Sequence, residues 1–237
     1  MNLIPLLSTV VTFVFALSVF RRYLVKGGAH LLVWSIGLLF YGMGTLTEVL
    51  LGLTYHELLL KIWYLCGAML TAAWLGQGTI YLLIHRKNVT HGISFLLALC
   101  SIVAVVLLAF APVTSAAASF NLTLPVSTQY KSILVRSGAI TALTILLNIY
   151  GTITMVGGAI YSGILFWRKS VLLNRVIGNI LIAAGALAPA MAGSLVKAGV
   201  VDALYFSELI GAVLMYIGFL QATTAPAQVP TTAPARG

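Results

Sequence analysis

Long runs of apolar residues, separated by short polar segments, form the main pattern along the chain. Runs of roughly 20 apolar residues are typical of helices that cross a membrane. The runs are continuous and do not alternate between apolar and polar positions, which favours helices over the strands of a membrane barrel. The pattern predicts an all-α integral membrane protein, a bundle of seven transmembrane helices. Their approximate bounds are residues 3–20, 31–53, 58–84, 92–111, 138–167, 173–199 and 203–221.

The other segments are expected to lie outside the helices. Residues 1–222 form the membrane domain in this interpretation, and residues 223–237, rich in Pro, Thr and Ala, form a flexible cytoplasmic tail. The longest loop, residues 112–137, is expected to hold a short strand or hairpin near residues 119–127. The first run has its basic residues after it and none before it, so we expect a retained helix and not a secretory signal peptide.

Composition and charge support the membrane interpretation. The chain is 61% hydrophobic and 7% charged, whereas soluble domains carry about 25% charged residues. The net charge of +9 comes from short basic clusters between apolar runs, which indicate topology and argue against a nucleic-acid partner. These clusters fall on alternate connections and comprise Arg21, Arg22, Lys26, Arg86, Lys87, Arg168, Lys169 and Arg175, with Arg236 in the tail.

The positive-inside rule applied to these clusters predicts an outer N-terminus and a cytoplasmic C-terminus. A multi-pass protein in a prokaryotic inner, or plasma, membrane is the expected location. The basic cytoplasmic face should attract anionic lipid headgroups, at about 1 kcal/mol for each nearby Lys or Arg.

All four acidic residues are predicted to lie in the outer half of the protein: Glu48, Glu57, Asp202 and Glu208. Charges at membrane depth are costly, and they are therefore candidates for function. Glu48 should lie about 7.5 Å inside the end of the second helix, and Lys61 about one turn into the third. Because a short loop joins these helices, Glu48 and Lys61 can meet. Lys197 and Glu208 repeat the arrangement in the last hairpin.

Two interpretations of these charges remain open. In the first, each acid pairs with its neighbouring base and stabilises its hairpin. In the second, Glu48 and Glu208 face an outward polar cavity between the second, third, sixth and seventh helices and bind a cation, proton or polar ligand. Glu48 falls on the polar stripe of its helix with Tyr41 and Thr45, so it is predicted to face the protein interior.

The sixth helix carries small residues and a proline at helical spacing. Gly185, Pro189 and Gly193 lie at i, i+4 and i+8, which predicts close approach of neighbouring helices. Pro189 removes a backbone hydrogen bond and should kink the helix, either as a hinge or only as shape.

Motifs for catalysis or cofactors are not found in the sequence. It has no intramembrane histidine pair for haem, no lysine in the last helix for retinal, and no zinc, hydrolase or nucleotide motif. No catalytic or metal-ligating residues are therefore assigned, and the protein is expected not to be an enzyme. No cofactor is identified, although the pattern leaves room for a bound lipid or pigment.

Residues 30–50, "HLLVWSIGLLFYGMGTLTEVL", and residues 60–64, "LKIWY", combine an aromatic opening, an acid near the helix end and an aromatic start to the next helix. In these features the chain resembles the seven-helix N-terminal sensor region of bacterial histidine kinases and their stand-alone relatives. The resemblance implies a membrane sensor, and it carries over to Glu48 and to the segment from Lys61 to Tyr64. No kinase domain follows the last helix, so a signal would pass to a separate protein.

The function predicted from sequence is that of a sensor, scaffold or accessory subunit that works through a membrane protein partner or a second copy of itself. The alternative is a small-solute, proton-coupled or cation-coupled transporter with an outward-facing site around Glu48 and Glu208. Helices one to three and five to seven have the same predicted orientation, with the fourth as an inverter, and such parallel repeats occur in transporters.

Overall fold

The structure, a computed structural model, describes residues 3–168, 173–197, 200 and 202–223. Its regular elements are all helical, which confirms the all-α prediction. They are α1 (Leu3–Lys26), α2 (Ala29–Leu51), α3 (Glu57–Trp63), the π-helix η1 (Tyr64–Leu70), α4 (Thr71–Leu83), α5 (Lys87–Ala109), the 3-10 helix η2 (Ser115–Ser119), α6 (Val126–Ile133), α7 (Gly138–Arg168), α8 (Leu173–Lys197) and α9 (Ala203–Thr223). The tail predicted at residues 223–237 lies outside the described residues, apart from Thr223 at the end of α9.

Within the described ranges, six helices are long and apolar enough to cross a membrane: α1, α2, the continuous rod α3–η1–α4, α5, α7 and α9. The helix α8 has 25 residues and contains Pro189, and it is not among these six. The first helix continues to Lys26, past its predicted end near residue 20. Gly27 and Gly28, with φ of 66° and 100°, then separate α1 from α2, since glycine adopts positive φ without a steric penalty.

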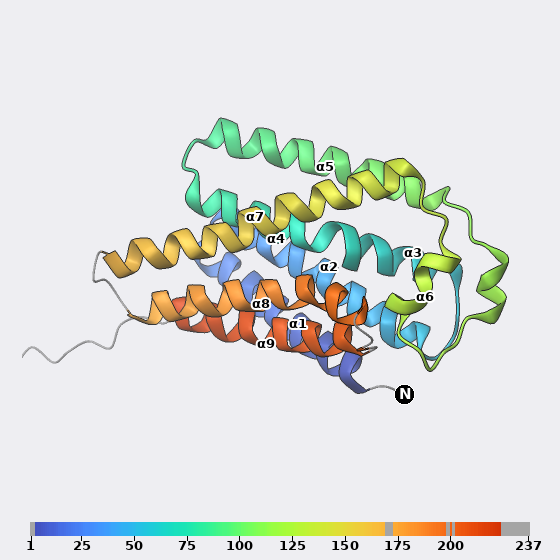
Figure 1. Cartoon of the computed structure of the whole chain (residues 1–237). Helices are drawn as coiled ribbons and strands as arrows, with labels where there is room; N and C mark the ends of the chain where they lie inside the picture. The colour runs from blue at the N-terminus through green and yellow to red at the C-terminus, as the bar shows by residue number, and fades with distance from the viewer. Residues whose placement is uncertain (1–2, 169–172, 198–199, 201, 224–237) are drawn as a thin grey trace, which may run out of the picture.

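Six rods pack in sequence order to form a closed ring: α1, α2, α3–η1–α4, α7, α8 and α9, which returns to α1. The helix α5 lies outside this ring, beside α4 and α7 (Figure 1). The short helix α6 covers one end of the bundle, where α2 ends and α9 begins (Figure 1). At the opposite end, Arg22 Nη2 of α1 donates a hydrogen bond to the carbonyl of Thr223 in α9, at 3.4 Å.

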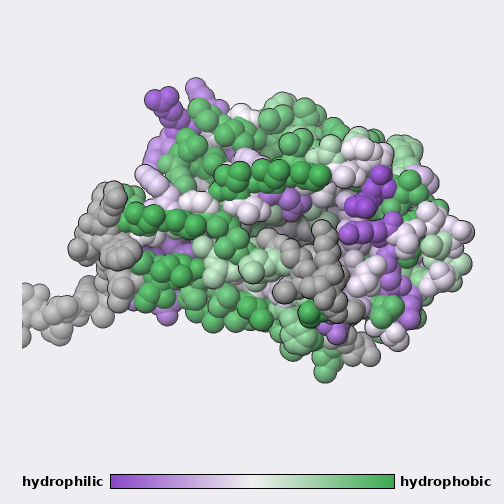
Figure 2. All heavy atoms as spheres, viewed as in Figure 1, coloured by the Kyte–Doolittle hydropathy of each residue, from purple (hydrophilic) through white to green (hydrophobic). Residues whose placement is uncertain are grey.

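The surface of the bundle is apolar along its sides and more polar at its ends (Figure 2). Phe95 of α5 and Phe110, directly after this helix, illustrate the apolar surface, since they are exposed by 74% and 84%. Exposed leucine, isoleucine and valine side chains continue along α1, α7 and α9. A surface of this kind suits a lipid environment, where polar side chains are costly.

The interior holds two clusters of buried side chains. One gathers around Tyr64, Met69 and Leu70 in the rod α3–η1–α4 and reaches α5, α6 and α7. The other joins α1, α2 and α9 through Phe15, Leu38 and Phe219 together with their neighbours. The ring therefore closes by packing between the first two helices and the last one.

The helices α8 and α9 pack with their backbones almost in contact. A Cβ atom built on Gly185 would lie 2.7 Å from the carbonyl oxygen of Gly211, and one built on Gly178 would lie 2.6 Å from that of Gly218. Such close approach needs residues without side chains on both helices. Pro189 lies over the same Gly211, whereas the contacts of Gly193 lie outside the described residues.

The prediction of a strand or hairpin near residues 119–127 was wrong. The chain forms η2, a turn and then α6, and only an isolated bridge joins Val113 to Leu134. Pro125 directly precedes α6, a position where its missing N–H costs nothing. The Asn121 side chain accepts a hydrogen bond from the Thr123 N–H at 2.9 Å, a local turn that competes with strand pairing.

Replacing a buried glycine of α7 with Ala should measure how closely α7 packs against α4. A Cβ atom on Gly151 would overlap the backbone of Ala72, whereas one on Gly157 would have no atom within 4 Å. Both changes to Ala gain the same helix propensity, so the difference between them reports packing. We expect Gly151→Ala to lower the free energy of unfolding by about 1–3 kcal/mol relative to Gly157→Ala. Unfolding in detergent, followed by circular dichroism, measures both variants, and equal stabilities would contradict the packing shown here.

Candidate functional site

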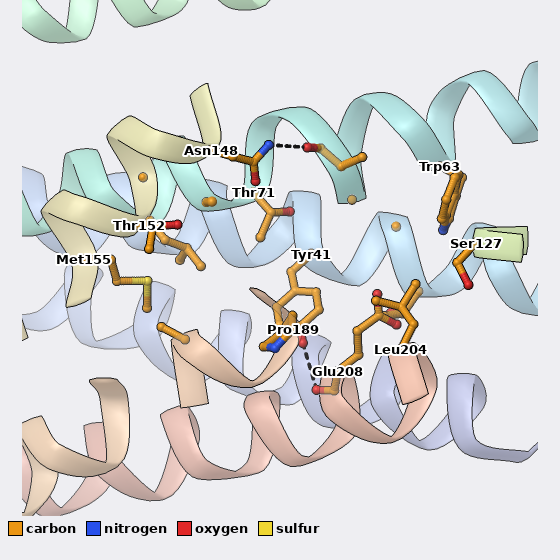
Figure 3. Close-up of a pocket in the computed structure, with 18 of the residues that line it drawn as sticks. Tyr41, Trp63, Thr71, Ser127, Asn148, Thr152, Met155, Pro189, Leu204 and Glu208 are labelled. Atoms are coloured by element: carbon orange, nitrogen blue, oxygen red, sulfur yellow. Dashed lines mark hydrogen bonds between the residues drawn. The ribbon is translucent and has the colours of Figure 1, made fainter. Parts of the chain in front are cut away.

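A cavity of about 390 Å³ lies inside the ring, below the helix α6. Five of the six rods contribute to its walls, and α6 contributes Ser127, Tyr130 and Lys131. Most of the other lining residues are small or apolar, with a few polar groups among them (Figure 3). Cavities of about 300–1,000 Å³ with mainly apolar walls are the usual form of sites for small molecules.

Glu48 lies at the α6 end of the bundle, and only 3% of it is exposed. The prediction that it faces the protein interior is therefore confirmed. The indole N–H of Trp63 donates a hydrogen bond to the Oε1 atom of Glu48 at 2.8 Å. The other carboxyl oxygen, Oε2, is buried and receives no hydrogen bond from an N–H or O–H donor of the described residues.

Glu208, in the second turn of α9, lines the cavity (Figure 3). Its carboxyl group lies within hydrogen-bonding reach of the Glu48 carboxyl group, and its own Oε2 is likewise buried without a donor among the described side chains and backbone. The hydroxyl group of Tyr41 donates to the backbone carbonyl of Glu208 at 2.8 Å, which fixes this turn of α9 against α2. The second and last helices thus bring two carboxyl groups together beside the cavity.

Two neighbouring carboxylates repel each other strongly in a medium of low dielectric constant. A shared proton or a bound cation would remove the repulsion. The pair is therefore a place where positive charge is stabilised.

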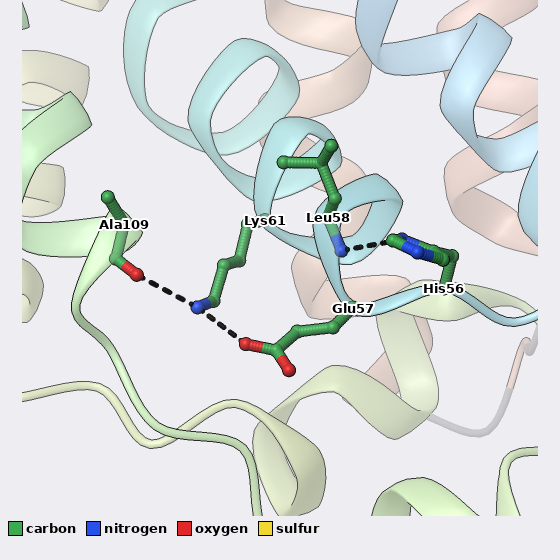
Figure 4. Close-up of polar contacts among 5 residues, drawn as sticks. All are labelled: His56, Glu57, Leu58, Lys61 and Ala109. Atoms are coloured by element: carbon green, nitrogen blue, oxygen red, sulfur yellow. Dashed lines mark hydrogen bonds and ion pairs between the residues drawn. The ribbon is translucent and has the colours of Figure 1, made fainter.

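Lys61 does not neutralise Glu48, so the hairpin pair predicted as one alternative is not formed. Its ammonium group lies 2.6 Å from the Glu57 carboxylate, one turn earlier in the same helix, and donates to the Ala109 carbonyl at 3.1 Å (Figure 4). Residues four apart share a face of a helix, whereas Trp63, two residues after Lys61, points to another side. Trp63 faces α2 and takes the position beside Glu48 that was predicted for Lys61.

The two other predicted site residues have different outcomes. Tyr64 is buried, and its hydroxyl group lies 3.2 Å from that of Thr144, so it joins the rod α3–η1–α4 to α7 and does not line the cavity. Lys197 is the last residue of α8, but its side chain lies outside the described residues. Its pairing with Glu208 stays a prediction.

A π-helix, η1, forms part of the cavity wall with Gly67 and Ala68. The helix α2 approaches it closely, since a Cβ atom on Gly44 would lie 3.0 Å from the Cα of Gly67. The Asn148 side chain of α7 donates to the Ala68 carbonyl at 2.7 Å, and the Thr71 hydroxyl group donates to the Cys66 carbonyl at 2.7 Å. These polar side chains satisfy carbonyl groups in the widened turn, and such turns occur frequently at functional sites.

The helix α6 is held over the cavity by aromatic contacts. The ring of Tyr130 lies 5.2 Å from that of Trp63 and 5.6 Å from that of Tyr64, and the Arg136 guanidinium lies 5.2 Å from its centroid. Burial raises the pKa of the Tyr130 phenol above its usual value, although Arg136 opposes this effect, so the phenol stays neutral at physiological pH. This cap was not predicted from the sequence, although residues 126–133 form an amphipathic segment that could have indicated it.

No group of three or more His, Cys, Asp or Glu side chains suitable for a metal ion occurs among the described residues. Comparison with known proteins found no matching family model, no similar curated protein and no similar solved structure.

Removing the indole N–H of Trp63 should expose the cost of burying Glu48. We expect Trp63→Phe to lower the free energy of unfolding by about 1.5–3 kcal/mol, because it deletes a hydrogen bond to a carboxyl group. Trp74→Phe is the matched control, since the Trp74 indole N–H donates to the neutral Ser101 hydroxyl group at 3.1 Å. That change should cost about 0.5–1.5 kcal/mol. Chemical unfolding in detergent compares the two, and a smaller effect at Trp63 than at Trp74 would contradict the assignment.

Proposed function

We propose that the protein is a seven-helix membrane sensor that binds a small solute in the cavity below α6 and passes the signal to a partner protein. The observation that carries the proposal is the cavity itself, with the Glu208 carboxyl group in its wall and that of Glu48 directly behind it. In this proposal α8 is the seventh membrane span, and the protein resides in a prokaryotic inner membrane.

The distribution of charge supports an orientation with the α6 end outside. Arg22 and Lys26 lie at the opposite end of α1, and Lys87 begins α5 at that same end (Figure 1). Positive charge of this kind marks the cytoplasmic side, where it also attracts anionic headgroups. The cavity would then open toward the outer half of the membrane, and a solute would reach it from outside the cell.

Binding without catalysis suits the wall of the cavity. Its residues include Gly44, Gly67, Ala72, Leu75 and Met155, which offer shape and apolar contact but no reactive group. The widened turn of η1 contacts both α2 and α7, so a solute against it could shift the packing between these helices. The exposed apolar face of α5, outside the ring, would contact lipid, a membrane protein partner or a second copy of the chain.

A transporter is the second candidate, and the arrangement of the ring favours it. The first three rods and the last three are each consecutive in sequence, and the remaining long helix, α5, lies outside the ring (Figure 1). Parallel three-helix units of this kind move against each other in some transporters, around a site near their interface. Pro189 lines the cavity and interrupts the hydrogen bonding of α8, where such a movement could hinge.

Filling the cavity should abolish solute binding whatever the solute is. Ala186 lines the cavity, whereas Ala184, two residues earlier in α8, is exposed. We expect Ala186→Phe to remove the thermal stabilisation that a library of small solutes gives the purified wild-type protein, because the new ring occupies the site. Ala184→Phe should retain it. The proposal fails if no solute stabilises the wild-type protein, or if the solutes that do so stabilise Ala186→Phe equally.

Flux measurements in proteoliposomes separate the two candidates. A sensor binds such a solute without carrying it across the membrane, whereas a transporter accumulates it inside the vesicles. If the wild-type protein takes up the solute and Ala186→Phe does not, the result would favour a transporter over a sensor.

A further inference from the structure

We infer that the cavity binds a small organic cation, with an ammonium group beside Glu208 and Glu48 and an apolar body toward Met155. This inference rests on the proposed function, because it names the class of solute for the same cavity. It is carried by the two facing carboxyl groups, by the size of the space next to them and by the distribution of polar and apolar residues along its walls.

The charge beside the cavity favours a cation. Glu48 and Glu208 each present a buried Oε2 atom that receives no hydrogen bond from a donor of the described residues. Among these residues the ion pair of Lys61 is with Glu57 and not with either of the two acids. Glu208 lines the cavity, so a cationic group inside it could lie beside the Glu208 carboxyl group and offset the repulsion from Glu48.

Two other basic groups of the described residues lie at the cavity, Lys131 in its wall and Arg136 near it, and neither forms an ion pair with Glu48 or Glu208. The Lys131 ammonium lies 5.9 Å from the centroid of Tyr130, and the Arg136 guanidinium lies 5.2 Å from the same ring. Lys131 is exposed, so water screens its charge from a cation inside the cavity. Asp202, just before α9, is also exposed and would add to the attraction for cations at this end.

The size of the cavity favours an organic cation over a metal ion. A space of about 390 Å³ is far larger than a metal ion needs, and it falls in the range of sites for small organic molecules. Calcium takes six to eight oxygen ligands, whereas the acidic side chains in reach are two, and no larger metal-ligating group occurs in the described part of the chain. An organic cation fills the remaining volume with its own apolar atoms.

The residues that line the cavity favour a ligand with one charged end and one apolar end. The aromatic residues Tyr41 and Trp63 lie at the acidic end of the cavity, and aromatic rings favour ammonium groups through cation–π attraction (Figure 3). Met155 and Thr152 lie at the far end (Figure 3), and Val156 and Met215 also line the cavity. A molecule with one charged end and one apolar end matches this order.

Titration of matched amines and alcohols into the purified full-length protein tests the inference. The probes are phenethylamine and hexylamine, each beside its neutral counterpart, 2-phenylethanol or hexanol, with affinity measured by isothermal titration calorimetry. We expect each amine to bind at least about tenfold more tightly than its alcohol, because a charge-assisted hydrogen bond is worth roughly a factor of ten or more. Glu208→Gln should lower the affinity for the amines by at least about tenfold, and Glu57→Gln, which changes an exposed acid, should leave it unaltered.

Equal binding of amines and alcohols, or full amine affinity in Glu208→Gln, would overturn the inference. Failure of both amines to bind the wild-type protein would overturn it too, as would their displacement by lower concentrations of Na⁺ or Ca²⁺. The proposed function is judged separately: alcohols that bind the wild-type protein but not Ala186→Phe would retain the cavity as a site while excluding a cationic solute. If Glu208→Gln does not elute as a folded protein, the comparison of amine with alcohol on the wild-type protein still decides.

Discussion

Repulsion between two neighbouring carboxyl groups, that of the buried Glu48 on α2 and that of the partly buried Glu208 on α9, is the constraint on which the rest of the site depends. In a medium of low dielectric constant such a pair is unstable unless positive charge is supplied. The base nearest to Glu48 in the sequence, Lys61, is instead held by Glu57 and by the end of α5. Within the described residues, the fold therefore keeps the two acids together without an ion pair to a base.

The surrounding structure maintains this arrangement through a few specific contacts. Trp63 donates to Glu48, and Tyr41 holds the turn of α9 that carries Glu208. The glycines of α8 and α9 allow these helices to pack with their backbones almost in contact, and α9 also packs against α1. Because Trp63 also contacts Tyr130 of α6, the same residue links the acidic pair to the cap of the cavity.

Much of the fold could be predicted from the sequence, since long apolar runs in a membrane leave the backbone few choices other than helices. The inward direction of Glu48 followed from the helical repeat in the same way. The hydrogen-bond partner of Glu48 could not be predicted in this way, because it depends on the rotation of α3 about its own axis. Lys61 and Trp63 are two residues apart and so point to different sides, and loop length alone cannot choose between them.

Other features had weaker signals in the sequence. The π-helix η1 has no recognisable pattern, because it is stabilised by contacts of Gly67 and Ala68 with helices distant in sequence. A strand or hairpin was predicted near residues 119–127, which contain residues that favour strands, and the helix α6 that follows was not predicted. This helix depends on the aromatic contacts that Tyr130 makes once the bundle has formed.

The pairing of charges can be measured most directly by two double-mutant cycles on the free energy of unfolding in detergent. One cycle combines Glu48→Gln with Glu208→Gln, and the other combines Glu48→Gln with Lys61→Met. The structure predicts a coupling energy of about 0.5–3 kcal/mol in the first cycle, because the carboxyl groups interact, and additivity within about 0.5 kcal/mol in the second. Additivity between Glu48 and Glu208, with coupling between Glu48 and Lys61, would contradict the facing carboxyl pair.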